Sequence, residues 1–148
     1  MGFKESVRTV LTQKYITFSG RASRSEYWWF QLFFWAVLIV LFALYVVVSD
    51  VARGPDESPS ISNVVVVVMG LFILATFLPH TALQIRRFHD RNTSGWLYLA
   101  ALILSFIPLL GRGVIGGIIA LSSFKGTVGP NKYGPDPLRP EMRAEVFA

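Results

Sequence analysis

The stretch that decides the fold is "YWWFQLFFWAVLIVLFALYVVVS", residues 27–49. It contains no charged side chain, and its aromatic residues gather at its beginning. At 1.5 Å per residue, a helix of this length crosses the roughly 30 Å hydrocarbon core of a bilayer. The stretch therefore predicts a membrane-spanning helix. Trp28 and Trp29 at its start are expected to anchor it at the level of the lipid headgroups.

A second uncharged stretch follows at residues 64–83. Its five consecutive valines would suit a strand, but its apolar length favours a second membrane helix. Pro79 is expected to bend or end the last turn of this helix. The composition agrees, because charged residues make up only 16% of the chain, against about 25% in a soluble domain.

The apolar region from residue 96 to residue 124 allows two interpretations. One is a single long helix, kinked at Pro108, with Arg112 near a membrane face. The other is a hairpin, in which residues 96–110 enter the membrane and residues 114–124 return as a fourth span or a re-entrant leg. The legs of such a hairpin are short for full spans.

The distribution of basic residues favours the hairpin. Residues 1–26 hold five Lys or Arg residues, whereas the loop at 50–63 holds one against three acidic residues. The loop at 84–95 holds three arginines, and the tail at 125–148 holds four Lys or Arg residues. Basic residues accumulate in cytoplasmic loops, so the N-terminus, the second loop and the tail are expected in the cytoplasm. A cytoplasmic tail requires an even number of crossings or a re-entrant hairpin.

Residues 3–18 carry an amphipathic pattern. Phe3, Val7 and Val10 recur at helical spacing, and the basic residues lie mostly off that face. Such a helix can lie in the membrane interface or pack against the protein's own core, and the sequence leaves both open. With this helix included, residues 1–148 are expected to form a single all-α membrane domain. It would have three or four hydrophobic segments, the last two as a short hairpin.

Polar residues are crowded into three blocks beside the spans. In "SRSE" (23–26) the spacing predicts a capping box, with Ser23 accepting a hydrogen bond from the Glu26 amide. "RRFHDRNTSGW" (86–96) lies between the second and third spans, and Trp96 at its end is a third expected interface anchor. If the blocks converge, opposite charges allow the ion pairs Arg24–Asp90 and Glu26–Arg87. The candidate polar cluster consists of Arg21, Arg24, Glu26, Arg87, His89, Asp90, Asn131, Tyr133 and Asp136.

Four separated blocks together resemble one bacterial inner-membrane family, domain of unknown function 805. The blocks are "FSGRASRSEYWWF" (18–30), "RRFHDRNTSGW" (86–96), "IPLLGRG" (107–113) and "GPNKYGPDP" (129–137). The "GRG" at 111–113 departs from the family pattern, in which a large apolar residue commonly follows the first glycine. The resemblance implies a bacterial plasma-membrane location and supplies no reaction.

The polar cluster could bind a ligand, stabilise the fold or take part in transport. Arginine forms bidentate hydrogen bonds to phosphate, and basic pockets at the cytoplasmic side bind acidic lipids. The cluster could therefore bind an anionic headgroup, or it could simply lock helix ends together near the interface. The leading hypothesis is a membrane interaction or scaffold protein that contacts anionic lipid, and a homo-oligomer or a membrane protein partner is allowed. The alternative is a small oligomeric channel or transporter.

Enzyme chemistry is not expected. His89, Asp90 and Ser94 are residue types of a nucleophilic triad, but adjacent His and Asp side chains rarely face each other and no nucleophile elbow surrounds Ser94. The chain has no cysteine and only two histidines, so neither a metal site nor a cofactor is expected. The net charge of +5 is explained by cytoplasmic loops rather than by a nucleic-acid partner.

Overall fold

The computed structural model describes residues 1–51 and 60–139. All the regular secondary-structure elements in this part of the chain are helices. The elements are α1 (Phe3–Arg8), a π-helical turn (Thr9–Gln13), α2 (Arg24–Val51), α3 (Ser60–Asp90), α4 (Gly95–Ser105) and α5 (Gly111–Ser123). The predicted all-α fold is confirmed. Part of the loop predicted at 50–63 and part of the tail predicted at 125–148 lie outside the described residues.

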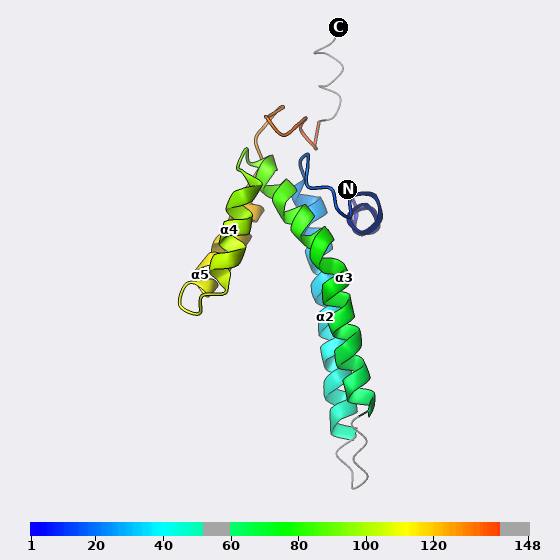
Figure 1. Ribbon diagram of the computed structural model, residues 1–148. Helices are drawn as coiled ribbons and strands as arrows, with labels where there is room; N and C mark the ends of the chain where they lie inside the picture. The colour runs from blue at the N-terminus through cyan, green and yellow to red at the C-terminus, as the bar shows by residue number, and fades with distance from the viewer. Residues whose placement is uncertain (52–59, 140–148) are drawn as a thin grey trace.

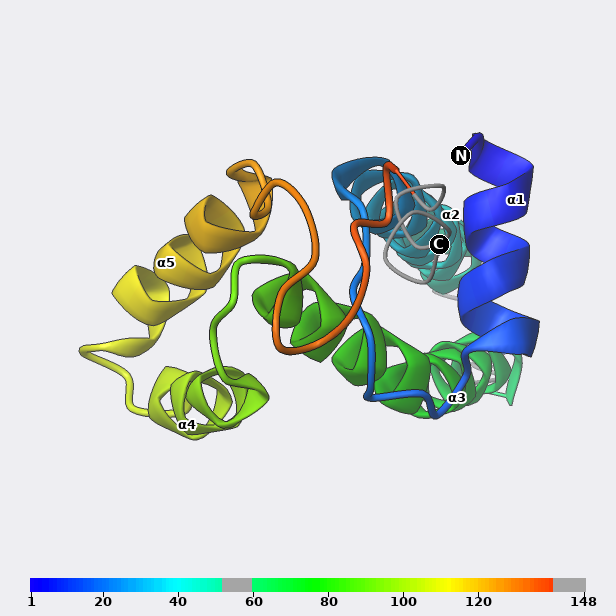
Figure 2. The ribbon, with the colours of Figure 1, turned by 90° about the horizontal axis from the view of Figure 1, so that it is seen from above.

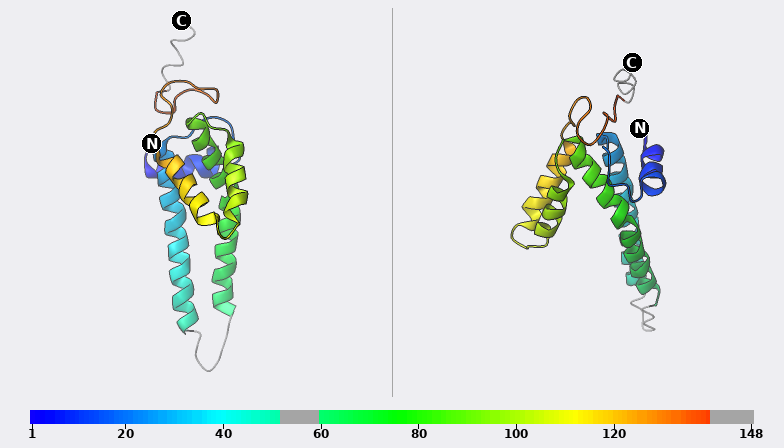
Figure 3. Two further views of the ribbon diagram at one scale, coloured as in Figure 1. Left: turned by 90° about the vertical axis from the view of Figure 1, so that its left-hand side faces the viewer. Right: turned by 45° about the horizontal axis from the view of Figure 1, so that its top comes forward.

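Helices α2 and α3 form a long antiparallel hairpin (Figures 1 and 3). Both are long and apolar enough to cross a membrane. Aromatic rings pack between them, with Phe34 stacked on Phe72 at 5.7 Å between ring centroids. Their outer faces expose large apolar side chains such as Trp35 and Leu74. A face of this kind is suited to lipid rather than to water.

Helix α3 continues through Pro79, which corrects the expectation that the helix could end there. Proline has no N–H, so the carbonyl of Ala75 loses its helical donor. The hydroxyl of Tyr15 donates a hydrogen bond to that carbonyl. The segment after the π-helical turn thereby supplies the missing donor, and α3 extends to Asp90. Arg87, His89 and Asp90 consequently lie in its last turns and not in a loop.

The two interpretations of residues 96–124 are resolved in favour of the hairpin. Helices α4 and α5 lie side by side and are joined by a turn at 106–110 (Figure 1). Within this turn the amide of Gly111 donates to the carbonyl of Ile107 at 2.8 Å. The α4–α5 hairpin diverges from α2 and α3 and ends partway along them (Figures 1 and 3). Arg112 therefore does not reach the level of the far ends of the long helices.

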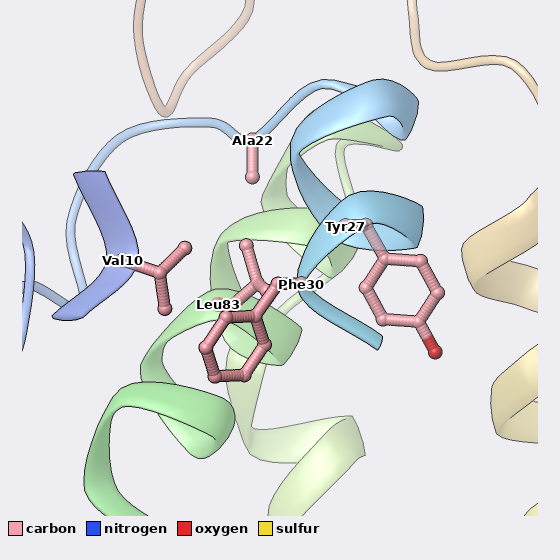
Figure 4. Close-up of a cluster of buried hydrophobic side chains, with 5 residues drawn as sticks. All are labelled: Val10, Ala22, Tyr27, Phe30 and Leu83. Atoms are coloured by element: carbon pink, nitrogen blue, oxygen red, sulfur yellow. The ribbon is translucent and has the colours of Figure 1, made fainter. Parts of the chain in front are cut away.

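The N-terminal segment lies across one end of the long hairpin, as Figure 2 shows. Its helical part ends at Gln13, short of the expected residue 18. Val10 is fully buried in a cluster with Ala22, Tyr27, Phe30 and Leu83 (Figure 4). Of the two alternatives left open by the sequence, the structure shows packing against the protein's own core.

Candidate functional site

The three polar blocks converge at the end of the molecule where α2 begins and α3 ends. The segment 124–139 passes across this end as a strap between α5 and the beginning of α2 (Figure 2). Asp90 lies at the centre. One carboxylate oxygen accepts a hydrogen bond from Arg21 Nε at 2.8 Å, and the other accepts from Arg87 Nη1. We call Arg21, Arg87 and Asp90 the polar clamp.

The two arginines of the polar clamp also bind backbone carbonyls. Arg21 donates to the carbonyls of Gly129 at 2.6 Å and Thr127 at 2.5 Å. Arg87 donates to Ser122 O at 2.8 Å, to Ala22 O at 3.2 Å and to Phe124 O. Both residues are buried. The polar clamp therefore ties the strap, α3 and the segment before α2 into one unit, and its donors are already engaged.

Gly126 belongs to the same arrangement, although nothing in the sequence singled it out. A Cβ at this position would collide with the carboxylate of Asp90. The neighbouring Thr127 amide donates to the Asp90 carbonyl at 2.8 Å. The strap thus approaches α3 so closely that only a glycine fits at residue 126. A lone glycine beside a lysine carries no sequence signal for such an approach.

The two predicted ion pairs are wrong in their partners. Asp90 pairs with Arg21 and Arg87 rather than with Arg24, and Glu26 pairs with Arg86 at 2.8 Å rather than with Arg87. Successive residues of an α-helix point about 100° apart. Arg86 therefore faces α2 while Arg87 faces the strap, and charge alone could not distinguish them.

The buried ion pair of Glu26 and Arg86 leaves two donor atoms of the arginine without a hydrogen bond in the described chain. Arg86 is fully buried, and its Nε and Nη2 have no hydrogen-bond partner within the described chain. The predicted cap of α2 is present in one half, since the Glu26 amide donates to Ser23 Oγ at 3.2 Å. The Glu26 carboxylate is directed to Arg86 instead of completing the capping box.

The remaining members of the predicted cluster also make internal contacts. The rings of His89 and Tyr133 stack with 3.8 Å between centroids, and Asn131 donates to the His89 carbonyl at 2.9 Å. Asp136 accepts from the amides of Gly129 and Leu138. These residues order the turns of the strap. The structure brings all the predicted polar residues to one end of the bundle. Most of them make hydrogen bonds, ion pairs or ring contacts that hold the fold together.

Beside the polar clamp lies a cleft of about 440 Å³. Arg21 and Asp90 of the polar clamp form one wall of the cleft. The rest of the lining is residues 23–25 at the start of α2 and the strap, from Lys125 to Val128 and from Asp136 to Leu138. Arg24 and Lys125 in this lining are exposed, and neither forms a hydrogen bond or ion pair through its side chain in the described chain. Ser25 supplies a hydroxyl near them, 3.1 Å from Ser23 Oγ. The cleft thus contains two cationic side chains that have no partner in the described chain. The two arginines of the polar clamp, by contrast, are both paired with Asp90.

The tryptophans expected as interface anchors are exposed at the same end. Trp28 and Trp29 lie in the first turns of α2, and Trp96 lies in the first turn of α4, 78% exposed. Phe3 packs edge-on against Trp29, with 5.8 Å between ring centroids. Their role at the headgroup level stays a prediction.

Most of the chain matches a known protein family. Residues 15–135 match the family model described as "Protein of unknown function (DUF805)". The chain is 37% identical to Inner membrane protein YhaI of Escherichia coli (strain K12), over 84% of this chain and 89% of the relative. It is 33% identical to Inner membrane protein YhaH of the same strain, over 84% and 90%, respectively. No solved structure matches significantly.

Proposed function

This chain belongs to the DUF805 family of bacterial inner-membrane proteins, and from that premise we propose that it binds an anionic lipid headgroup in the cleft at the first turn of α2. In this proposal the protein is a multi-pass scaffold of the inner membrane. The N-terminus, the strap and the cleft face the cytoplasm. The observation that carries the proposal is the pair of uncommitted cations, Arg24 and Lys125, in one cleft.

The division of labour among the basic residues supports this site. The guanidiniums of Arg21 and Arg87 are buried and bound to Asp90 and to backbone carbonyls. A phosphate could reach them only by displacing those partners, so they belong to the fold and not to the ligand. Arg24 and Lys125 are exposed and remain available. Arginine binds phosphate through a planar fork, and lysine binds it as a point charge.

The position of the cleft also fits a headgroup. It is lined by the first turn of α2, and the exposed Trp28 and Trp29 follow directly in the same helix. Tryptophan prefers the interface between hydrocarbon and water, which is where lipid phosphates lie. The sequence places five Lys or Arg residues before residue 27 and only one in the loop at 50–63. This asymmetry supports a cytoplasmic position for the cleft.

The test is retention of lipid by the purified full chain. The chain would be extracted in mild detergent with phosphatidylglycerol, and bound lipid would be counted by native mass spectrometry. We expect the double variant Arg24→Ala/Lys125→Ala to lose bound phosphatidylglycerol while its helical content and unfolding temperature persist. The matched control is Arg8→Ala, which removes an exposed charge from α1. Equal retention by the double variant and the control would reject the site.

The alternative of an oligomeric channel or transporter has one observation in its favour. Between α2 and α3, His80 Nε2 lies 3.1 Å from Gln31 Oε1, and Gln31 donates to the Tyr27 hydroxyl at 3.0 Å. Polar side chains at membrane depth often mark pathways. These three, however, are satisfied by one another, and such a chain also joins neighbouring helices. Ion flux into liposomes that carry the full chain would favour the channel.

A further inference from the structure

The tip of the α4–α5 hairpin is apolar apart from a single arginine. The side chains of the turn point outward, with Phe106 80% exposed and Leu109 91% exposed. In water these side chains would be left unburied at a cost of about 1.5–3 kcal/mol each. In a chain whose neighbouring helices span a membrane, this turn therefore belongs in the hydrocarbon region.

The length of the hairpin sets how deep the tip lies. Helix α4 has 11 residues and α5 has 13 residues, which correspond to about 17 and 20 Å. The hydrocarbon core is about 30 Å thick. The open ends of the hairpin lie beside the end of α3, and the tip lies partway along α2 and α3 (Figures 1 and 3). Because the hairpin is inclined to α2 and α3, its reach across the bilayer is shorter than these lengths (Figure 1). The tip therefore lies at about the middle of the bilayer or slightly beyond it, and it stops short of the leaflet surface away from the polar clamp.

Arg112 sits at this tip, in the first turn of α5. Its side chain is exposed, and no residue of the described chain forms a hydrogen bond or an ion pair with it. An arginine in the hydrocarbon region is costly, and it is tolerated when it reaches headgroups or draws water and lipid phosphate inward. Its partner must then come from outside the described chain. The guanidinium fork matches a phosphate in shape and charge.

We propose that Arg112 holds the phosphate of a phospholipid from the far leaflet, the one away from the polar clamp, below its normal level. The bilayer at the hairpin tip is thereby thinned, and phospholipid crosses from one leaflet to the other faster than through undisturbed bilayer. The physical reason is the shorter apolar path, because a headgroup that meets a cation partway across is desolvated over less distance. This activity is separate from the cleft and does not depend on lipid binding there.

The experiment uses the full chain in vesicles of phosphatidylethanolamine and phosphatidylglycerol that carry a trace of tail-labelled fluorescent phospholipid. Dithionite bleaches the outer leaflet, and loss of the protected fluorescence reports lipid crossing. We expect vesicles with the wild-type chain to lose the protected fraction and vesicles with Arg112→Leu to keep it, as protein-free vesicles do. Arg139→Leu is the matched control, because Arg139 is also exposed but lies in the strap. It should behave as the wild type.

A second measurement keeps the proposal falsifiable if a variant folds poorly. The chain has no cysteine, so a fluorophore can be attached to a single cysteine in place of Leu109 without background. Quenching by spin labels at known depths should place it between the middle of the bilayer and the far headgroups. Each of three results would overturn the proposal. The first is a label at the headgroup level. The others are lipid crossing that is no faster with the wild-type chain than in protein-free vesicles, and a crossing rate that is unchanged in Arg112→Leu. Loss of cleft binding in Arg24→Ala/Lys125→Ala would leave it standing.

Discussion

At the scale of single residues, the end of the molecule that holds the polar clamp depends on Asp90. Its carboxylate is the shared counterion of two buried guanidiniums, those of Arg21 and Arg87. Each of these also holds backbone carbonyls of segments remote in the sequence. A buried charge without its partner costs far more than an exposed one. The stability of this end is therefore concentrated in one acidic side chain.

We predict that Asp90→Asn destabilises the protein strongly. The substitution keeps the shape but leaves two buried guanidiniums without a counterion, which costs about 3–5 kcal/mol when a buried pair is broken. The measurement is the unfolding temperature in detergent. Asp136→Asn provides the control, because Asp136 accepts only backbone amides in the described chain, and a smaller loss is expected. Equal losses would show that the polar clamp has no special weight.

The sequence indicated where the polar residues cluster but not how they pair. Their types and their clustering beside apolar spans were visible, because charge is rare in this chain. The partners were not, since Arg86 and Arg87 are neighbours with identical chemistry and differ only in the direction in which α3 points them. That direction depends on α3 continuing to Asp90. Propensity could not show this in a segment that looked like a loop.

Gly126 gives a second residue-scale prediction. In Gly126→Ala the new methyl group would collide with the Asp90 carboxylate, which two arginines hold in place. The strap must move away, so we expect a lower unfolding temperature and faster proteolysis of the strap. Gly116→Ala is the matched control, because a Cβ at Gly116 meets nothing within 4 Å. This control should be neutral or slightly stabilising, since alanine favours a helix over glycine by about 1 kcal/mol.

At the scale of elements, α3 shows how a break in a helix is repaired from outside. Pro79 removes the donor that the Ala75 carbonyl would have had, and Tyr15 replaces it. Proline bends or ends a helix because a backbone hydrogen bond is lost and the ring clashes with the carbonyl four residues earlier. Here the N-terminal segment supplies a hydroxyl. The sequence therefore predicted a bend or an end at Pro79 with good reason, and it could not show the donor sixty residues away.

We predict coupling between Tyr15 and Pro79. Tyr15→Phe leaves the Ala75 carbonyl without a donor, and we expect a loss of about 0.5–1.5 kcal/mol because this hydrogen bond is exposed. In the background of Pro79→Ala the helix supplies its own N–H, so the same Tyr15→Phe change should cost much less. The four unfolding free energies of this double-mutant cycle measure the coupling. Additive losses would mean that the hydroxyl and the proline act independently.

The element ends show what hydrophobic length can and cannot define. Apolar length located all four hydrophobic segments, and charge counting selected the hairpin over one long helix. The actual bounds extend into polar sequence, because α2 begins at Arg24 and α3 ends at Asp90. These polar turns are helical since the polar clamp and the Ser23 cap satisfy their side chains and backbone. Such tertiary contacts lie outside any window of sequence.

At the scale of the whole molecule, the contacts of the polar clamp constrain the membrane topology. Arg21, before α2, donates to carbonyls of Thr127 and Gly129 in the strap after α5. Arg87, at the end of α3, donates to Phe124. Segments joined by direct hydrogen bonds cannot lie on opposite sides of a bilayer. We therefore expect the N-terminal segment and the strap to share one side of the membrane, and the α4–α5 hairpin to return to the side from which it enters.

Single-cysteine labelling tests this arrangement, and the cysteine-free chain gives no background. A membrane-impermeant maleimide added to intact cells should leave Lys4→Cys and Lys132→Cys unlabelled and should label a cysteine at residue 57. After the cells are permeabilised, all three should react. A cysteine in place of Arg112 should resist the reagent under both conditions, because maleimides react with thiolates and the hydrocarbon region excludes thiolates and water.

If Lys4→Cys and Lys132→Cys label from opposite sides, the clamp contacts do not exist in the membrane. If both label from outside, the contacts stand but the cleft faces away from the cytoplasm. In that case a headgroup bound by Arg24 and Lys125 belongs to the outer leaflet.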